Sequence, residues 1–570
     1  MEGKTKIISA NGREIAIECK SVAKINTLNC VNCGTCREVC PTGAVEEMQR
    51  TVCRLCPSCT DRPAMTMDEN DAFSVSKACT TECPLGISPQ GYVNLTKLGQ
   101  YDDAYQLIWK KNPLPSVCGR ICHHPCEQAC KRGTLVDEPI AIRGIKRFLS
   151  DNVDLKVKKY PVIHDEEVAV IGAGPAGIMT AHTLSQFGYQ VTVYDSAPVA
   201  GGMLVTGIPK FRLPRNVVAK EIAKLKQAGI TFKLSENIGK ARMEELKQEY
   251  EAVVVATGAP YSKELKIEGW RKEGVYTALQ FMQNVDNEEL IKRHPGQYFN
   301  YKDAEVVVIG GGNVALDCAR SAVRLGAKKV TCTCLESGED VPCHEWERKE
   351  AEEEGIEILE GWAPQEFTGV HNELSGVAYK KVINFSKENG KINFDTDDSQ
   401  TMELKADYVI VAIGQTAQEI WQNYYDDEQV FFAGDVKDPA NSVVNAMASG
   451  RAAAISVDEK FRGRKVKDEL ENRKLTLAPQ LEKVFPANRL RIARPDMPIL
   501  PAAERVNTFD EVETAYSEAV IKAETNRCLQ CGYQAVDPSK CIGCGTCMRA
   551  CPKGDAITMV AMEDGGAKSC

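Results

Sequence analysis

The sequence predicts an α/β protein in which two Rossmann-like dinucleotide-binding domains, one interrupting the other, follow a helical cysteine-rich domain and are flanked by small cysteine-rich modules. Two observations support this prediction: two glycine-rich loops that each follow a buried strand, and nineteen of the 25 cysteines gathered in short groups. The 570 residues leave room for roughly three or four domains of ordinary size.

The composition excludes several classes of protein. The net charge of -9 is spread along the chain without a basic patch, which argues against a nucleic-acid partner. No stretch approaches the ~18 apolar residues of a membrane span, and the first residues lack the apolar core of a signal peptide. We therefore expect a cytoplasmic protein without membrane insertion, in which cysteine serves metal or redox chemistry rather than disulfides.

The two ends of the chain carry matching cysteine ladders. Residues 30–41 read CVNCGTCREVCP and residues 541–552 read CIGCGTCMRACP. Both follow the C-x2-C-x2-C-x3-C-P spacing that holds iron–sulfur cubanes, which exchange single electrons. The predicted ligands in these ladders are Cys30, Cys33, Cys36, Cys40, Cys541, Cys544, Cys547 and Cys551.

A second cysteine group, CRLCPSC, follows the N-terminal ladder, and its thiols are Cys53, Cys56 and Cys59. In two-cluster ferredoxins the fourth cysteine of a ladder serves the other cluster, so we expect Cys40 to join this group. The first three cysteines of the ladder then lack an assigned fourth ligand, because the place four residues after Cys59 is Pro63.

The remaining cysteine groups lie in the predicted helical domain and just before the C-terminal ladder. CTTECP is followed by CGRICHHPCEQAC, whose cysteines recur every four residues, a spacing that places successive thiols on one face of a helix. The ligands predicted here are Cys79, Cys83, Cys118, Cys122, Cys126, Cys130, Cys528 and Cys531. Nineteen cysteines at about four per cubane indicate four or five [4Fe–4S] clusters. Structural zinc, which also binds paired C-x2-C, is the alternative, chiefly for the Cys528 pair.

The first glycine loop lies in VAVIGAGPAG, residues 168–177. A buried strand opens into Gly172, Gly174 and Gly177, a helical stretch follows, and a second strand ends at Asp195. Glycines let the backbone approach a pyrophosphate, the helix N-terminus faces its charge, and an acid about twenty residues on can hold a ribose. The complete pattern predicts a dinucleotide site.

The second glycine loop, EVVVIGGGNVA, repeats the pattern with Gly310, Gly312 and Ala315. A helix and a strand, KKVTCTC, follow, and the alternating Cys332 and Cys334 of this strand are expected to be buried rather than ligands. Two such units indicate two dinucleotides, one of which we expect to be a flavin. Three later strands, at 253–258, 409–414 and 431–436, are predicted to return to the first domain, which the second domain therefore splits.

Several longer motifs carry a resemblance to a known family. They are GGMLVTGIPKFRLPR at 201–215, CPLGISPQGYVNL at 83–95 and VCGRICHHPCEQAC at 117–130. From about residue 76 to about residue 460 the chain resembles the small subunit of NADPH-dependent glutamate synthase and its relatives. These include the N-terminal part of dihydropyrimidine dehydrogenase and the FAD subunit of bifurcating ferredoxin:NADP oxidoreductases. The resemblance implies that FAD takes a hydride from a nicotinamide and releases single electrons through nearby cubanes to a partner.

The resemblance also implies roles for individual residues. The FAD site would contain Gly172, Gly174, Gly177, Asp195, Gly202, Gly434 and Asp435. The nicotinamide dinucleotide would lie against Gly310, Gly312 and Ala315. Family members usually carry a further C-x2-C shortly before the position of Cys79, and this chain lacks it. Either Cys528 and Cys531 fold back to supply the missing thiols, or the group at 53–59 does.

The end of the second strand bears on the choice of nucleotide. Relatives that use NADPH commonly have paired arginines there, whereas this chain has Leu335 and Glu336. A carboxylate repels a 2′-phosphate and accepts hydrogen bonds from free ribose hydroxyls, which favours NAD(H) over NADP(H). Ala315, a residue often found in NADP sites, points the other way, and Glu336 as a solvated turn residue is a further alternative.

The predicted order of domains is a ferredoxin-like module at 1–75, a helical [4Fe–4S] domain at 76–160, an FAD domain at 161–300 and 386–460, an NAD(P) domain at 301–385, a connector at 461–520 and a ferredoxin-like module at 521–570. We expect a diaphorase-type oxidoreductase subunit of a hetero-oligomer that links NADH to FAD, the clusters, and a ferredoxin or a large catalytic redox subunit. The alternatives are a glutamate synthase small subunit and a wiring subunit whose flavin does not react with nicotinamide.

Overall fold

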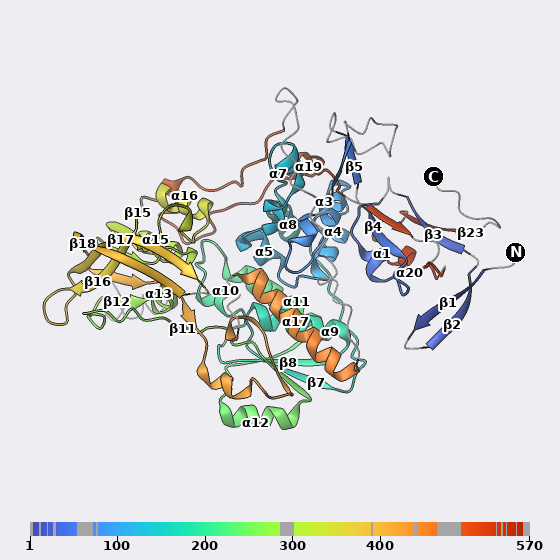
Figure 1. Cartoon of the computed structure of the whole chain (residues 1–570), viewed down its shortest axis with the longest axis horizontal. Helices are drawn as coiled ribbons and strands as arrows, with labels where there is room; N and C mark the ends of the chain where they lie inside the picture. Colours follow the sequence, from blue (N-terminus) through green and yellow to red (C-terminus); the bar gives the residue numbers. More distant parts are fainter. Residues whose placement is uncertain are drawn as a thin grey trace. The chain divides into compact units, whose positions relative to one another are not determined.

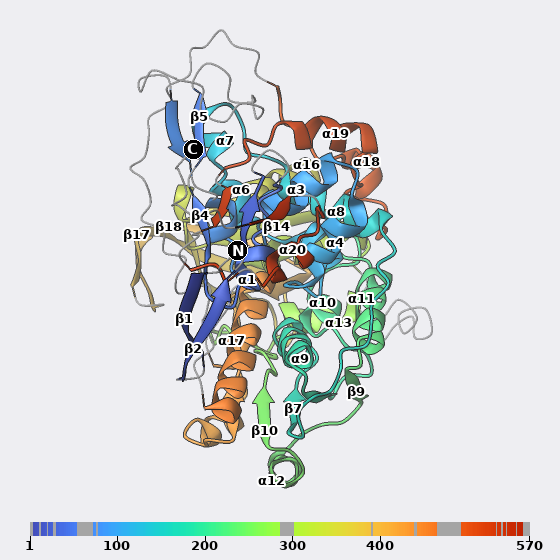
Figure 2. The same cartoon turned by 90° about the vertical axis from the view of Figure 1, so that its right-hand side faces the viewer.

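The computed structural model divides the chain into two compact units, which we describe separately (Figures 1 and 2). The first unit comprises Met1–Lys156, Lys467–Met497 and Ala515–Cys570, and the second comprises Val157–Val466 and Pro498–Thr514. The structure describes residues 4–10, 13–19, 21–26, 30–48, 50–53, 72–75, 78–285, 301–388, 391–437, 442–463, 492–531, 533–536, 540–542, 544–554 and 556–561. No helix in these ranges is long and apolar enough to cross a membrane.

A parallel five-stranded sheet with the order β21-β10-β7-β8-β9 forms the first half of the second unit. Its strands are β7 (Glu167–Ile171), β8 (Gln190–Asp195), β9 (Thr231–Leu234), β10 (Ala252–Val255) and β21 (Val430–Phe432). Its helices include α9 (Pro175–Phe187), α10 (Met203–Thr206), α11 (Arg215–Gln227), α12 (Lys240–Glu249) and α17 (Val443–Arg462). Helices α9 and α17 cross closely at Gly450, where there is no room for a side chain. A Cβ atom on Gly450 would lie 2.1 Å from the carbonyl oxygen of Ala176.

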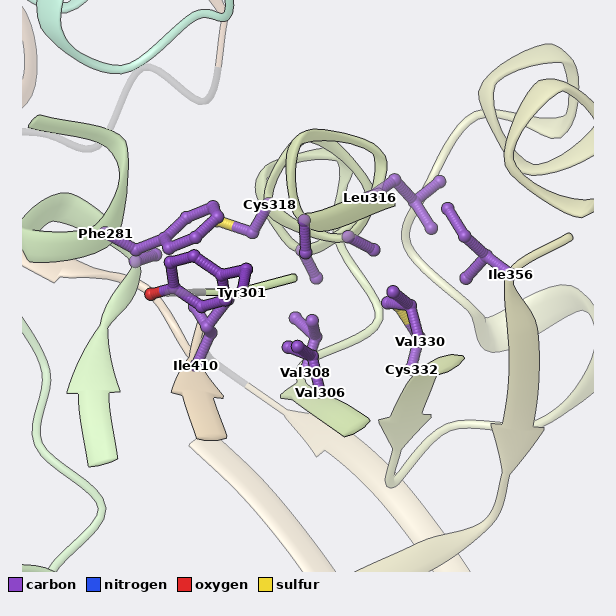
Figure 3. Close-up of a cluster of buried hydrophobic side chains, with 14 of the residues drawn as sticks. Phe281, Tyr301, Val306, Val308, Leu316, Cys318, Val330, Cys332, Ile356 and Ile410 are labelled. Carbon is purple, nitrogen blue, oxygen red and sulfur yellow. The ribbon is translucent and has the colours of Figure 1, made fainter. Parts of the chain in front are cut away.

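A second parallel sheet has the order β12-β19-β13-β14-β15. Its strands are β12 (Val275–Thr277), β13 (Glu305–Ile309), β14 (Lys329–Cys334), β15 (Glu357–Glu360) and β19 (Tyr408–Val411). Helices α13 (Ala278–Val285), α15 (Asn313–Arg324) and α16 (Glu345–Glu353) accompany it, and β16 (Trp362–Thr368), β17 (Gly376–Glu388) and β18 (Lys391–Lys405) form an antiparallel sheet. Cys318 and Cys332 are buried among apolar side chains between α15 and the parallel sheet, as expected for Cys332 (Figure 3).

One strand lies in a different sheet from the one that the sequence predicts. The segment 409–414 was expected to return to the first sheet, but β19 pairs with β12 and β13 in the second. Strands β10 and β21 do pair in the first sheet, as expected. The physical reason is that VIVAIG, VVVATG and FFAGDV are all apolar strands followed by glycine, so their composition does not distinguish between two parallel sheets.

The first unit contains the predicted helical region. Its helices are α2 (Ala78–Thr81), α3 (Pro89–Lys97), α4 (Tyr101–Trp109), α5 (Pro115–Ile121), α6 (Pro125–Gln128), α7 (Lys131–Leu135), α8 (Ile142–Asn152) and α19 (Glu518–Asn526). Helix α3 begins with Pro89 at a favoured position after the N-cap Ser88. Helix α19 packs against α3 and α8, and the buried Arg527 that follows it pairs with Asp137 and Glu524.

The two ends of the chain form a single body in the first unit. Strand β3 (Ser21–Ile25) pairs with β23 (Ile557–Ala561), and β4 (Val45–Met48) pairs with β22 (Tyr533–Val536) (Figure 1). Helices α1 (Thr35–Glu38) and α20 (Thr546–Arg549) contact each other, and both ends contribute to one apolar core. The sequence suggests two separate ferredoxin-like modules, whereas the structure joins them, since residues of both ends are buried together in this core. We call this the ferredoxin body.

Candidate cofactor sites

The first three thiols of the N-terminal ladder lie beside the last thiol of the C-terminal ladder. Burial raises the pKa of the Cys36 thiol, and the neighbouring Cys33, Cys30 and Cys551 thiols raise it further, with a smaller effect from Cys547. Cys551 therefore lies near the three thiols that lacked an assigned fourth ligand. We call Cys30, Cys33, Cys36 and Cys551 quartet A.

A cavity in the ferredoxin body is lined by the remaining four ladder cysteines, Cys40, Cys541, Cys544 and Cys547, which we call quartet B. Burial and the neighbouring Cys541, Cys40 and Cys544 thiols raise the pKa of Cys547. The Cys40 thiol is held here because the backbone N–H of Ala44 donates to its Sγ at 3.2 Å.

The position of Cys40 differs from the sequence-based expectation, which joined it to Cys53, Cys56 and Cys59. Cys53 ends strand β5 (Arg50–Cys53), which pairs with β6 (Ala72–Val75), and Cys56 and Cys59 lie outside the described residues. The expectation placed the other cluster of the pair at the nearest cysteines that follow Cys40 in the sequence. The structure instead brings Cys40 together with cysteines of a ladder that lies more than 500 residues away.

A third set of thiols surrounds a cavity in the helical region. Cys79, Cys130, Cys528 and Cys531, which we call quartet C, line it together with Pro89, Gln90 and Val93 of α3. Burial raises the pKa of Cys528 to about 11, with Cys130 adding to the effect. Of the two alternatives for the missing C-x2-C pair, the structure places Cys528 and Cys531 beside Cys79.

The fourth set gathers around a buried lysine. Burial alone would lower the pKa of Lys146. The neighbouring Cys122, Cys118, Cys126 and Cys83 thiols outweigh burial, so the pKa of Lys146 is raised. These four cysteines form quartet D. Lys146 is only 5% exposed and lies on α8, which packs against the α5 helix that carries Cys118. Quartet D therefore has a cation as its buried neighbour.

The quartets fit cube-shaped clusters in their arrangement. Within the described ranges no three His, Cys, Asp or Glu side chains lie close enough for a single metal ion. In a [4Fe–4S] cube each thiolate binds a different iron, so the four sulfurs surround a volume rather than a point. The cavities lined by quartets B and C have this form. The backbone N–H of His124 donates to the Sγ of Cys122 at 3.4 Å.

Glycines form a close-packed cradle after β7 in the first sheet. Gly172 has a φ of 109°, and a Cβ atom there would lie 2.3 Å from the carbonyl oxygen of Ala256. A Cβ atom on Gly177 would lie 1.9 Å from the carbonyl oxygen of Gly172. Helix α9 begins at the N-cap Gly174 without a side-chain cap, so its first N–H groups are available for a phosphate.

The predicted acids and later glycines lie at the same edge of this sheet. Asp195, at the end of β8, accepts the backbone N–H of Ala173 at 2.6 Å and that of Ala197 at 2.8 Å. The carboxylate thereby holds the loop that follows β7. Gly202 approaches this loop, and Gly434 and Asp435 follow β21 after Ala433. All predicted flavin-site residues thus surround the carboxyl ends of parallel strands, where α/β sheets bind ligands.

The second sheet presents a similar loop. Gly310 has a φ of 143°, and its Cβ position would lie 2.4 Å from the carbonyl oxygen of Ala412. A Cβ atom on Gly312, the N-cap of α15, would meet open space, and Ala315 is fully buried. Glu336 lies two residues beyond β14 and is half-buried.

Acidic side chains gather around Glu336. Burial and the nearby carboxylates of Glu336 and Glu360 raise the pKa of Cys334 to about 12. Arg348 is engaged by two carboxylates, since its guanidinium lies 2.6 Å from Glu360 and 2.9 Å from Glu352. The end of β14 therefore combines carboxylates with an arginine that is already paired.

Comparison with known families agrees with this division. A pyridine nucleotide-disulphide oxidoreductase model matches residues 166–450, a model of dihydropyrimidine dehydrogenase domain II with its 4Fe-4S cluster matches 72–157, and a 4Fe-4S binding domain matches 23–46 and 535–554. The chain belongs to the FAD- and NAD(P)-dependent iron–sulfur oxidoreductases. These models imply a flavin and iron–sulfur clusters in this oxidoreductase.

Three curated relatives of the oxidoreductase illustrate the family. It is 32% identical to the beta subunit of NADP(+)-dependent formate dehydrogenase from Moorella thermoacetica, over 80% of this chain and 71% of the relative. It is 32% identical to the PreT subunit of NAD-dependent dihydropyrimidine dehydrogenase from Escherichia coli (strain K12), over 68% and 91%. It is 29% identical to the small chain of NADPH glutamate synthase from Azospirillum brasilense, over 66% and 84%.

Two residues near the quartets were not anticipated from the oxidoreductase sequence. Lys146 follows an apolar residue in an ordinary helical stretch, and its burial depends on tertiary packing. Asn32 lies inside the first C-x2-C pair, where its left-handed φ of 53° and burial leave no sequence signal. The meeting of the two ladders did have a signal, because the first three cysteines of the N-terminal ladder lacked an assigned fourth ligand nearby.

Proposed function

We propose that this oxidoreductase subunit passes electrons between NAD(H), FAD and four [4Fe–4S] clusters, and from there to a ferredoxin or a large catalytic redox subunit. Helix α3 supports this proposal, because its residues lie close to three of the four quartets. A Cβ atom on Gly91 would lie 2.7 Å from the Cα of Cys33 in quartet A, and Gln90 lines the cavity of quartet C. The pKa of the buried Tyr92 is raised by burial and by thiols of quartets C and D. Such proximity supports transfer of electrons from cluster to cluster.

The four quartets are the proposed cluster ligands. Sixteen cysteines then bind four clusters at about four thiolates each. A fifth cluster, within the sequence-based range, would require Cys53, Cys56 and Cys59. Since three thiols do not complete a cubane, we propose four clusters. The first ladder supplies Cys40 to the second, and the second supplies Cys551 to the first.

Gly172, Gly174 and Gly177 are the proposed contacts of the FAD pyrophosphate, and Asp195, which holds their loop, would face the ribose. When bound, FAD accepts a hydride and releases its electrons one at a time. The protein contributes the close backbone approach and the uncapped start of α9. Gly202, Gly434 and Asp435 complete the proposed FAD site.

The proposed nicotinamide dinucleotide is NAD(H), bound by Gly310, Gly312 and Ala315. Glu336 would accept hydrogen bonds from the ribose hydroxyls, while the paired Arg348 is not available to neutralise a 2′-phosphate. The Moorella relative is named as NADP(+)-dependent and the Escherichia relative as NAD-dependent, so membership of the family is compatible with either nucleotide.

The ferredoxin body is the proposed outlet to the partner. Among the described cysteines Cys544 of quartet B is the one exposed thiol-bearing residue. The relatives are subunits of formate dehydrogenase, glutamate synthase and dihydropyrimidine dehydrogenase, which supports a hetero-oligomer for this chain. A cluster near the surface of that body would be the one within reach of a partner's redox centre.

Anaerobic addition of NADH to the isolated chain tests the proposed function. We expect the visible absorbance of the bound flavin to bleach, faster with NADH than with NADPH, in the absence of any partner. If dithionite bleaches the flavin but neither nucleotide does, the chain is a wiring subunit and the proposed reaction is wrong. Chromatography of the released cofactor provides the control, since it identifies FAD.

A further inference from the structure

Asn32 lies between the thiols of quartet A and those of quartet C. It is the third residue of the four-residue C-x2-C segment at 30–33 and is only 1% exposed. Its backbone N–H donates to the Sγ of Cys30 at 3.3 Å, and its side-chain Nδ2 donates to the carbonyl oxygen of Cys531 at 3.1 Å. One residue is therefore hydrogen-bonded to a ligand-bearing residue of each quartet.

Further contacts hold the Asn32 amide in this orientation. Nδ2 also donates to Oε1 of Gln90 at 3.3 Å, and the Ser88 hydroxyl donates to the carbonyl oxygen of Asn32 at 3.3 Å. Both partners belong to the start of α3, whose Gly91 approaches Cys33 so closely that a side chain does not fit. The φ of 53° places the side chain in this junction, and asparagine tolerates such a conformation better than most residues.

We propose that Asn32 is a positioning residue that couples quartets A and C for electron transfer. Two hydrogen bonds and the covalent bonds between them connect Cys30 Sγ to the backbone of Cys531. Electrons tunnel more readily along such a bonded path than across an unbonded gap. The step moves one electron: the cluster of one quartet is oxidised by one electron, the cluster of the other is reduced by one, and no bond is made or broken. The proposal deepens the proposed function and rests on its four-cluster assignment.

Gln530 provides a matched control in the same junction. It is the third residue of Cys528–Cys531, as Asn32 is of its own pair, and its φ is 50°. Its backbone N–H bonds to the Cys528 thiol, and its side chain donates to Oδ1 of Asn94 at 3.0 Å. These contacts connect Gln530 to quartet C and to α3, and its side chain is not part of the path through Asn32, so loss of the Gln530 side chain should leave that path intact.

Asn32→Gly and Gln530→Gly preserve the backbone N–H donors and suit the left-handed backbone, so each variant loses only the side-chain amide. The full chain with its clusters is reduced by a light-activated deazaflavin, and freeze-quench EPR follows redistribution of the electron among the clusters. The electrons do not come from NADH, so failure of the nicotinamide reaction would leave this test unaffected. We expect Asn32→Gly to slow redistribution between quartets A and C at least tenfold, and Gln530→Gly to slow it less than twofold.

Iron content and the midpoint potentials of the clusters should be unchanged in both variants, which separates coupling from loss or retuning of a cluster. Asn32→Leu, which keeps the side-chain size but has neither a donor nor a charge, should reproduce the slow rate and replaces the glycine variant if that one does not fold. The proposal is overturned by a wild-type rate in the Asn32 variants, by equal slowing in the control, or by slowing that accompanies lost iron or shifted potentials.

Discussion

The crossing of cysteines between the two ladders predicts an unusual pattern of iron loss. Quartet A takes Cys551 from the C-terminal ladder, and quartet B takes Cys40 from the N-terminal ladder. Four clusters correspond to about sixteen irons per chain, so a substitution that empties one quartet should remove about four. Two substitutions in one quartet should remove no more than either alone.

The informative pair of double variants therefore combines Cys551→Ala with a second change. With Cys36→Ala, a residue distant in sequence but in the same quartet, the loss should stay near four irons. With Cys547→Ala, a neighbour in sequence but in the other quartet, the loss should reach about eight irons per chain. Comparison of doubles with singles isolates the coupling between two positions.

The assay is iron and acid-labile sulfide per chain after anaerobic purification, with protein measured by amino-acid analysis. Cys318→Ala, which alters a buried thiol far from any ladder in sequence, is the control and should lose no iron. If the losses add for Cys551 with Cys36 but not for Cys551 with Cys547, each ladder holds its own cluster and the crossed assignment is refuted.

Three other substitutions test separate features. Glu38 lies 2.5 Å from Lys111 and 2.9 Å from Lys110; burial raises its pKa, but these lysines outweigh burial and lower it from 4.5 to about 2. These two ion pairs thus stabilise the protein above pH 4.5, and the stabilisation is lost as the pH falls toward 2. Glu38→Gln should therefore lower the free energy of unfolding, measured with urea, by at most roughly 3 kcal/mol at pH 7, and the difference between wild type and variant should be smaller at pH 4. Lys146→Met removes a buried positive charge beside quartet D and should lower the potential of that cluster by roughly 59 mV, a tenfold change in its reduced fraction, in an EPR redox titration; an unchanged potential would contradict the placement of the ammonium group. Replacing Leu335 and Glu336 with arginines should shift the kcat/KM ratio toward NADPH about tenfold, or about 1.4 kcal/mol, in a diaphorase assay; a preference for NADPH in the unaltered protein would contradict the role of Glu336.

Patterns that depend on local sequence predicted much of the molecule. The strand, glycine loop and helix around Gly172 and around Gly310 occur where the sequence places them, because backbone crowding at these positions admits only glycine. The helical region after residue 78 is also confirmed. These features are local, so a window of about thirty residues contains their physical cause.

The features that the sequence did not predict depend on distant segments. Cys40 has several chemically equivalent candidates for partners, and only the pairing of β3 with β23 and of β4 with β22 selects the C-terminal ladder. The assignment of 409–414 to a sheet was wrong for a related reason, since parallel buried strands share one composition. Lys146 and Asn32 acquire their roles from burial, which a single sequence does not show.

Delivery of electrons from NADH to the ferredoxin body is the central claim, and freeze-quench EPR of the isolated chain tests it most directly. The chain is mixed anaerobically with NADH, and its spectra are compared with those of the Cys551→Ala and Cys40→Ala variants, which identify the signals of quartets A and B. We expect both signals to appear after the flavin is reduced, with no partner protein present. If NADH reduces the flavin while quartets A and B stay oxidised, although dithionite reduces them, the ferredoxin body is not the outlet for these electrons.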